Sequence, residues 1–255
     1  MVEIKTPGEL DAMREAGRVV ARTLQAVTRH AAPGIRLDEL DELAATLINE
    51  AGATPAFLGY HPPFAPTPYP GVLCTSVNDV IVHGIPTPYR LREGDLLSID
   101  CGAYLDGWAG DSATTVTVGP AAPADASLID TTRRALRAAI AAAVPGNRIG
   151  DIGHAVATTA RAAGYGIQAD FGGHGIGRRM HEDPHVSNHG RPGRGLPLRP
   201  GLVLAIEPMF IAGGDDRYRT APDGWSLLTV DRSRAAHEEH TVAVTADGPR
   251  ILTLP

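Results

Sequence analysis

The sequence predicts an α+β fold, with two pairs of helices on one face of a curved, mostly antiparallel sheet. Two observations carry this prediction. A helix–helix–strand pattern occurs twice along the chain, and short apolar or β-branched runs separate and follow the helix pairs. Two large repeated units close on each other instead of stacking into an open array. We therefore expect one domain over residues 1–255, with related halves of about 1–120 and 121–255.

The first helix pair has clear start and stop signals. Thr6-Pro7-Gly8-Glu9 is typical of a capping box, with the threonine at the N-cap and the proline at the first helical position. Pro33-Gly34 ends this helix, and a second helix is predicted over about 37–50. Apolar residues spaced by three and four form the buried face of the first helix: Leu10, Met13, Gly17, Val20, Leu24 and Val27.

The second half repeats this pattern. One helix is predicted over about 127–144 and another from about 149 until Ala163-Gly164. Pro33-Gly34 and Pro145-Gly146 lie 112 residues apart, and so do Ala51-Gly52 and Ala163-Gly164. Two matches at one offset favour a duplicated unit over coincidence.

Strands are predicted where the chain is apolar or β-branched over a few residues. The stretch 55–70 holds six prolines and can be neither a helix nor a central strand, so we expect an ordered loop or lid there. The predicted strands cover residues 96–99, 114–118, 202–206, 225–230 and 240–244.

Two aspartates stand out in a predicted hairpin. A two-residue turn at Asp106-Gly107 would place Asp111 opposite Gly102, and Asp100 opposite Ala113. Both carboxylates then lie on one face as diagonal neighbours. They repel each other unless a cation or a proton lies between them. A metal pair is one solution; two solvent-facing aspartates are the alternative.

Histidines and carboxylates elsewhere are weaker candidates when each is taken alone. Glycines surround His174, which indicates either an exposed, approachable ring or an incidental turn. The stretch from His181 to His185 matches the zinc-protease pattern, but Pro184 excludes the continuous helix that this pattern requires. His181 alone remains a candidate acid or hydrogen-bond donor, on the same exposed segment as His174. Three further candidates lie at strand ends: His83, Glu207 and Glu239.

Composition excludes several classes of protein. Lys5 is the only lysine among 23 basic residues and lies outside any Gly-rich loop, which argues against Schiff-base catalysis and a P-loop. A pI near 5.9 argues against nucleic acid as the main ligand, and we expect no DNA partner. The two cysteines, Cys74 and Cys101, form no disulfide framework, so we expect a reducing, cytoplasmic environment. The N-terminus has no apolar signal-peptide region, and no run approaches the ~20 apolar residues needed to span a membrane.

Five motifs in a fixed order carry a family resemblance. They are His83-Gly84-Ile85-Pro86, Asp100 with Asp111, Gly173-His174-Gly175-Ile176-Gly177, Ile206-Glu207-Pro208-Met209 and Glu239-His240-Thr241. Together they resemble the type I methionine aminopeptidases. The resemblance covers nearly the whole chain and implies the pita-bread fold that these enzymes share with creatinase and the Xaa-Pro peptidases. It also implies removal of the N-terminal methionine from nascent polypeptides, with a small second residue favoured.

The resemblance implies two divalent metal ions, Co²⁺, Mn²⁺, Fe²⁺ or Zn²⁺, as cofactors. Asp111 and Glu239 would bridge both ions, His174 and Glu207 would bind one, and Asp100 would chelate the other. A hydroxide activated by the metals would then attack the first peptide bond.

The same resemblance implies catalytic roles for three residues. Glu207 would shuttle the proton, His181 would steady the tetrahedral oxyanion and His83 would hold the scissile amide. Both histidines are therefore also expected to bind substrate.

The resemblance places the pocket for the methionine side chain at Tyr60, Cys74 and Trp225. Phe57 occupies a place often held by a small cysteine, and Met180 replaces a common aromatic. The loop over 62–70 is longer than usual, so a second pocket aromatic could be Phe64 or Tyr69. These departures concern the shape of the pocket, since the predicted metal ligands are all present.

Two alternative functions remain open. One is an Xaa-Pro aminopeptidase or dipeptidase of the same fold, although these usually carry an additional N-terminal domain. The other is a non-catalytic binding module, although such relatives typically lose metal ligands.

We expect a monomer. Transient contact with ribosomal RNA is a further possibility that would add to catalysis, and a merely solvated surface is its alternative. The arginines that would make this contact are Arg178, Arg179, Arg191, Arg194 and Arg199.

Overall fold

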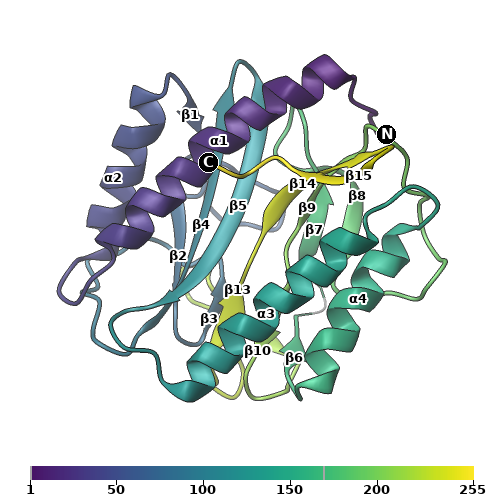
Figure 1. The fold of residues 1–255 in the computed structure, drawn as a ribbon. Coiled ribbons are helices and arrows are strands. Elements are labelled where there is room, and N and C mark those ends of the chain that lie inside the picture. The colour runs from purple at the N-terminus through teal and green to yellow at the C-terminus, as the bar shows by residue number, and fades with distance from the viewer. Residues whose placement is uncertain (1, 169) are drawn as a thin grey trace.

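The computed structural model describes residues 2–168 and 170–255. Two helix pairs lie across one face of curved β-structure (Figure 1), which confirms the predicted α+β class. The first pair packs over the strands of the N-terminal half and the second over those of the C-terminal half. The helices are α1 (Pro7–His30), α2 (Leu37–Glu50), α3 (Pro123–Ala142) and α4 (Ile149–Ala162). None of the helices in the described part of the chain has the length and apolar character needed to cross a bilayer.

The helix boundaries follow local chemistry. The Thr6 side chain accepts a hydrogen bond from the Glu9 backbone, and the Glu9 carboxylate accepts one in return, so the predicted capping box of α1 is confirmed. The bounds of α2 are those predicted. α3 begins at Pro123, earlier than the predicted 127, because proline is well suited to the first helical position.

Matching backbone geometry accompanies the sequence repeat. Gly34 and Gly146 have φ values of 92° and 96°, and Gly52 and Gly164 have 72° and 76°. These left-handed conformations favour glycine. The two helix pairs therefore end alike, as the repeat hypothesis predicts. The single-domain organisation over 1–255 stays a prediction.

The strands form four hydrogen-bonded sheets in the described residues, and the pairings of their strands are antiparallel. One sheet pairs β1 (Thr54–Pro55), β4 (Leu96–Leu105), β2 (Leu73–Val77) and β5 (Trp108–Thr117). The largest has the order β15 (Gly248–Ile251), β14 (His240–Thr245), β9 (Val203–Ile206), β7 (Gly172–Gly175) and β8 (Glu182–Ser187). The two smaller sheets join β13 (Ala235–His237), β10 (Met209–Ile211) and β6 (Gly166–Ile167), and β11 (Tyr218–Thr220), β12 (Leu227–Thr229) and β3 (Val80–Val82).

The β4–β5 hairpin has the predicted register. Asp111 lies opposite Gly102 and Asp100 opposite Ala113, with the turn at Asp106 and Gly107. Both strands are longer than predicted, because small residues such as Ala103 and Ala109 extend the pairing toward the turn. The two aspartates therefore share one face.

Two glycines let helix α1 lie directly on this hairpin. A Cβ added to Gly110 would come within 2.9 Å of the Gly17 backbone. A Cβ added to Gly17 would come within 2.4 Å of the Leu252 carbonyl oxygen. The helix, the hairpin and the C-terminal segment are thus held at backbone contact distance, which fixes the strands that carry both aspartates.

The proline-rich stretch forms an ordered loop, as predicted, apart from Pro55 in the short strand β1. Tyr69 anchors it. The Tyr69 hydroxyl lies 3.0 Å from the Leu73 carbonyl and 2.8 Å from that of Gly84, and the Tyr69 amide donates to the Tyr60 carbonyl. The loop is therefore held against β2 and can provide a fixed wall.

The only lysine joins the N-terminal segment to the start of β8. Lys5 Nζ lies 2.8 Å from Glu182 Oε2, and both side chains are 3% exposed. Glu182 Oε1 also accepts a hydrogen bond from the Arg179 amide. Burial is the largest single influence on the pKa of Glu182 and would raise it, but the hydrogen bonds and charges of Lys5 and Arg179 together outweigh burial, so the pKa is lowered.

Lys5→Met should lower the free energy of unfolding by about 3–5 kcal/mol, because it leaves a buried carboxylate without its cation. Chemical denaturation at neutral pH measures this change. Arg18→Met, which removes an exposed ion pair with Glu15, should cost less than about 1 kcal/mol and serves as the control. If the two variants lose the same free energy of unfolding, the buried Lys5–Glu182 pair stabilises the protein no more than an exposed ion pair does, which contradicts this prediction. Much of the loss should return in Lys5→Met/Glu182→Leu, which replaces both charges by apolar groups.

Candidate metal centre and active site

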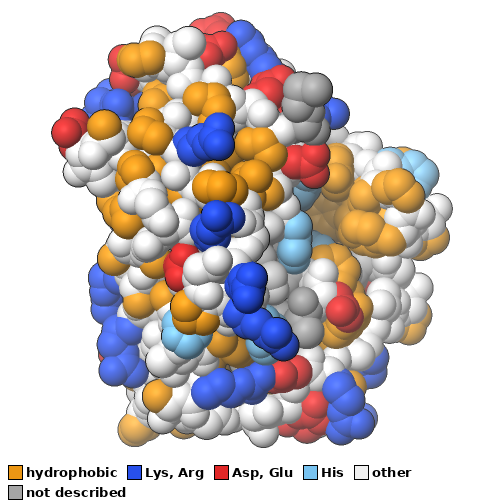
Figure 2. Space-filling model, turned by 90° about the vertical axis from the view of Figure 1, so that its right-hand side faces the viewer, with side chains coloured by type: hydrophobic (Ala, Val, Ile, Leu, Met, Phe, Trp, Pro, Cys, Tyr) orange, Lys and Arg blue, Asp and Glu red, His pale blue; other side chains and the backbone are white. Residues whose placement is uncertain are grey.

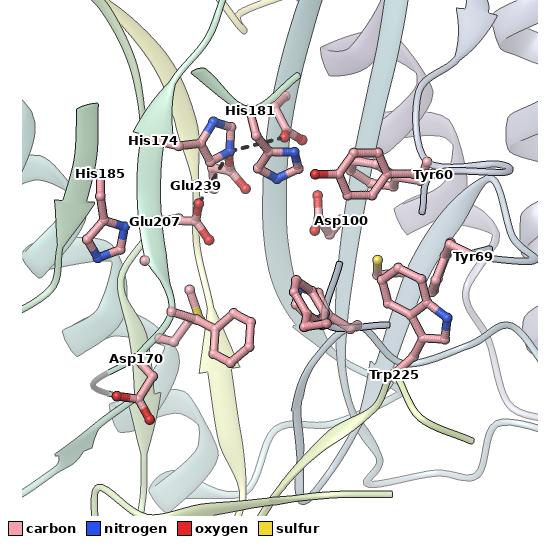
Figure 3. Close-up of a pocket in the computed structure, with 18 residues that line it drawn as sticks. Tyr60, Tyr69, Asp100, Asp170, His174, His181, His185, Glu207, Trp225 and Glu239 are labelled. Atoms are coloured by element: carbon pink, nitrogen blue, oxygen red, sulfur yellow. Dashed lines mark ion pairs between the residues drawn. The ribbon is translucent and has the colours of Figure 1, made fainter. Parts of the chain in front are cut away.

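Side chains from both halves of the chain converge on one cavity of about 210 Å³. The β4–β5 hairpin supplies Asp100 and Asp111, and β7 supplies His174. Glu207 follows β9 and Glu239 precedes β14, two neighbouring strands of the largest sheet. Figure 3 shows the labelled members of this cluster pointing toward one another. The structure thus brings together all five residues that the sequence analysis expects to bind metal.

Glycines around His174 allow close backbone approach. A Cβ on Gly173 would lie 2.1 Å from the Ala205 carbonyl oxygen, and one on Gly175 would lie 2.1 Å from that of Asp183. The expectation of an exposed His174 ring is wrong, because neighbouring strands pack so tightly that the residue is only 8% exposed. The glycines therefore bury the ring between strands.

The ring of His174 faces two carboxylates. Its Nε2 lies 3.8 Å from Asp111 Oδ2 and 3.6 Å from Glu207 Oε1. Its Nδ1 lies 2.9 Å from the Gly175 carbonyl, so Nδ1 carries the proton and donates it. Burial lowers the pKa of His174 to about 4. The ring is therefore neutral near pH 7, and the Nε2 lone pair is free to bind a cation.

The four carboxyl groups are strongly perturbed. Burial raises the pKa of Asp100 to about 7. Burial and then the charge of Asp100 raise the pKa of Glu207 to about 8. Burial, followed by the charges of neighbouring carboxylates, raises the pKa of Asp111 and of Glu239 well above the usual range. So much negative charge in one buried place is unfavourable unless protons or cations offset it.

Several carboxylate oxygens at this site have no hydrogen-bond partner to offset their negative charge. Asp100 Oδ1, Asp111 Oδ1 and Glu239 Oε1 are buried without a hydrogen-bond partner in the described residues. The ligand atoms of Asp111, His174 and Glu239 lie within 4.8 Å of one another. Four carboxylates and one imidazole suit divalent first-row ions, which accept oxygen and nitrogen ligands. The residues present therefore fit a divalent metal centre.

Two histidines stand over this cluster. The His181 ring stacks on Tyr60 at 5.0 Å between centroids and lies 4.3 Å from the His174 ring. His83 follows β3 in a left-handed conformation, with φ of 61°, and its buried Nδ1 has no partner in the described residues. Burial lowers the pKa of His83 to about 4, so it is neutral and keeps one N–H to donate.

An aromatic and sulfur-containing wall completes the cavity. Tyr69 and Trp225 pack edge to face at 4.9 Å, and Trp225 Nε1 donates to the Thr67 carbonyl. Phe57 and Cys74 line the same wall. Phe64 and Tyr69, which the sequence left as alternatives, both line the cavity. Figure 2 shows histidine side chains at the edge of a hollow that hydrophobic side chains border.

Met180 is not among the residues that line the cavity. The residue is 2% exposed and belongs to the apolar cluster that contains Phe57. Its terminal methyl would lie 2.7 Å from a Cβ added to Gly102. Contact between Met180 and the substrate stays a prediction.

Most of the segment that matches the zinc-protease pattern forms strand β8, and His181 directly precedes this strand. A strand rises about 3.3 Å per residue, so His181 and His185 do not stand one helical turn apart as that pattern requires. The rejection of that interpretation is confirmed.

Sequence reasoning missed several residues at or beside the cavity. The Phe171 ring lies 5.5 Å from the His83 ring between centroids. Its position directly before the glycine-rich segment around His174 could have indicated that it lies at the site. His237, two residues before Glu239, carries a nitrogen close to the carboxylates. Asp170, His185 and Met209 also line the cavity.

Comparison with known proteins places this site in a family. A sequence profile of metallopeptidase family M24 matches residues 11–246. The chain belongs to this family. Members of metallopeptidase family M24 are metal-dependent hydrolases, which agrees with the donor set at the cavity floor.

Two family M24 relatives show how far the similarity extends. Methionine aminopeptidase 1 of Mycobacterium tuberculosis (strain CDC 1551 / Oshkosh) is 54% identical over 261 residues, covering 100% of this chain and 96% of the relative. Methionine aminopeptidase 1 of Bacillus subtilis (strain 168) is 44% identical, covering 99% of each.

Solved structures confirm the pita-bread fold. The methionine aminopeptidase of Thermotoga maritima superposes with a TM-score of 0.95 at 40% identity, covering 100% of both chains. A prolidase from Pyrococcus furiosus has a TM-score of 0.79 at 22% identity, covering 99% of this chain and 65% of the prolidase, and shows the fold alone.

Stabilisation by Mn²⁺ should be larger at pH 8 than at pH 6. The raised pKa values of Asp100 and Glu207 favour the folded metal-free protein below the unfolded values, and this contribution is lost as the pH rises toward about 7–8. A divalent cation takes the place of the lost protons, so it stabilises most at the higher pH. Thermal unfolding of chelator-stripped protein with and without Mn²⁺ measures the shift.

Asp100→Asn/Glu207→Gln removes two of the ionisable groups and should flatten both the pH dependence and the response to Mn²⁺. An Mn²⁺ shift in Tm that is the same at both pH values in the unmodified protein would contradict this account.

Proposed function

We propose that this chain removes the N-terminal methionine from nascent or newly made proteins and favours a small second residue. The observation that carries the proposal is one cavity that joins a floor of four carboxylates and one imidazole to an aromatic and sulfur-containing wall. Full-length relatives at up to 54% identity that are named methionine aminopeptidases support the same substrate.

The metal centre is proposed to hold two divalent ions, Co²⁺, Mn²⁺, Fe²⁺ or Zn²⁺. Asp111 and Glu239 would bridge them, His174 and Glu207 would complete one position, and Asp100 would chelate the other. When bound, such ions supply Lewis-acid polarisation of a carbonyl and lower the pKa of water toward 7. The carboxylates that hold them are fixed by strand pairing and need little reorganisation.

The cavity wall accounts for the methionine side chain. A thioether makes favourable contacts with aromatic rings, and Tyr69, Phe57 and Trp225 present such rings beside Cys74. The free amino group of the substrate is a cation and is attracted toward the acidic floor. The floor and the wall together orient an N-terminal methionine with its first carbonyl over the carboxylates.

Three residues would transfer a proton or donate a hydrogen bond during the reaction. Glu207 would accept a proton at a carboxylate oxygen and return it to the departing amine. His181, held by its stack on Tyr60, would donate a hydrogen bond to the developing oxyanion. Neutral His83 would donate its N–H to the substrate amide.

The cellular setting is proposed to be the cytoplasm, with the protein acting as a monomer on N-termini of nascent chains. The five arginines singled out in the sequence are all exposed. Arg178 is already engaged, since it stacks on Trp108 at 3.7 Å. Contact of this cluster with ribosomal RNA stays a prediction, and a solvated surface remains the simpler interpretation.

The proposed activity is tested by cleavage of Met-Gly-Met-Met against a Gly-Pro peptide, after chelation and refilling with single metals. We expect release of methionine from the first peptide only, lost on stripping and restored by divalent ions. Cleavage of the Gly-Pro peptide alone would assign the chain to the Xaa-Pro peptidases. Undiminished activity in stripped protein would overturn the metal mechanism, and inactivity with every metal would favour a non-catalytic module.

His181→Ala should lower kcat by about 10²-fold or more while leaving metal content unchanged, because the ring acts on the developing oxyanion. Turnover and metal content of the same refilled samples measure both effects. His185→Ala removes another histidine of the cavity lining and serves as the control. Full activity in His181→Ala would remove this residue from the mechanism.

A further inference from the structure

His237 is a buried imidazole beside the candidate metal centre. It ends strand β13 and is 2% exposed. Its Nε2 lies 3.7 Å from Glu207 Oε2 and 3.6 Å from Glu239 Oε2. This nitrogen has no hydrogen-bond partner in the described residues. An unpaired polar atom buried between two carboxylates requires an explanation.

The surroundings of His237 repeat those of His174. The two rings approach the two oxygens of Glu207, with His174 Nε2 3.6 Å from Oε1 and His237 Nε2 3.7 Å from Oε2. A hydrogen bond would need about 2.7–3.2 Å. Two ligands bound to one ion at about 2.1 Å each lie about 3.0–3.5 Å apart. The 3.6 Å between His237 Nε2 and Glu239 Oε2, like the 3.6 Å between His174 Nε2 and Glu207 Oε1, is therefore closer to the separation of two ligands of one ion than to that of a hydrogen bond.

Two overlapping sets of ligand atoms follow from this arrangement. Asp111, His174 and Glu239 form one set, and Asp100, His237 and Glu239 form the other, each with its ligand atoms within 4.8 Å of one another. Glu239 belongs to both sets. Each set contains one imidazole. The two sets are therefore more alike in their ligand types than they would be if His174 were the single histidine of the centre.

The backbone of His237 is locked in place. Its N–H donates to Thr115 Oγ1 at 2.9 Å, and Thr115 Oγ1 donates to the His237 carbonyl at 2.7 Å. Strand pairing with β10 places His237 opposite Met209. The ring can therefore move only slightly toward the carboxylates, as a preorganised ligand does.

We propose that His237 is a nitrogen ligand to the metal position that contains Asp100 and Glu239. This inference rests on the proposed function, since it deepens the description of the same centre. The position otherwise has only oxygen ligands. An added imidazole should raise its preference for Fe²⁺, Co²⁺ or Zn²⁺ relative to Mn²⁺.

His237→Gln should weaken binding of Co²⁺ at one of the two positions by about 10–100-fold and leave the other unchanged. Calorimetric titration of stripped protein with Co²⁺ measures both affinities. The ligand-field absorption of the loaded protein should change as one nitrogen is lost. His185→Gln removes a different histidine of the cavity and should change neither measurement. Unchanged affinities and an unchanged spectrum in His237→Gln would overturn the proposal.

A second measurement needs no variant and so does not depend on how His237→Gln folds. The unmodified protein, labelled with ¹⁵N in histidine, is stripped and titrated with Zn²⁺. Two imidazole nitrogens should acquire the shifts of metal-bound nitrogen, whereas only one would overturn the proposal. If the unmodified protein cleaves Met-Gly-Met-Met but binds metal through one imidazole, His237 alone is excluded. If it neither binds two ions nor cleaves, the proposed function fails as well.

Discussion

Repulsion among four buried or partly buried carboxylates is the constraint on which this structure depends. Asp100, Asp111, Glu207 and Glu239 meet in one place, and loss of solvent raises the pKa of each, with neighbouring negative charges adding to this rise for Asp111, Glu207 and Glu239. Without compensation, such a cluster would cost several kcal/mol for each charge that is desolvated. Protons can compensate at low pH and cations at higher pH, so protonation and metal binding are two answers to one electrostatic problem.

The fold keeps these groups together against their repulsion. Each carboxylate lies on or beside a strand whose neighbours are fixed by antiparallel hydrogen bonds, so it cannot relax by moving alone. Glycines bring the backbones into contact, as Gly17 does for α1 and the hairpin, and as Gly173 does for β7 and β9. The fixed positions of the few residues at the centre thus depend on close packing of backbone segments far from it. The helix pairs pack against the same sheets, and the apolar surface that they bury stabilises the fold against the charge repulsion at the centre.

Sequence reasoning succeeded where a local rule was strong. The register of the β4–β5 hairpin followed from one turn, and it placed Asp100 and Asp111 on a common face. It failed where the outcome depended on packing between distant segments. The burial of His174 depends on β8 and β9, and Met180 is buried in an apolar cluster that also contains Phe57. The position of His237 depends on Thr115, more than one hundred residues earlier, and no local pattern indicates that pairing.

The similarity to prolidases separates what the fold determines from what the loops determine. At 22% identity a prolidase retains the fold with a TM-score of 0.79, so the sheet scaffold does not depend on one substrate. The aromatic wall of this chain is formed by loop residues and not by the strands of the sheets. Tyr60, Phe64 and Tyr69 belong to the proline-rich loop, and Trp225 lies just before β12. Because these side chains line the same cavity as the carboxylates but lie outside the strands that carry Asp100 and Asp111, the wall can differ between chains that share the sheet scaffold.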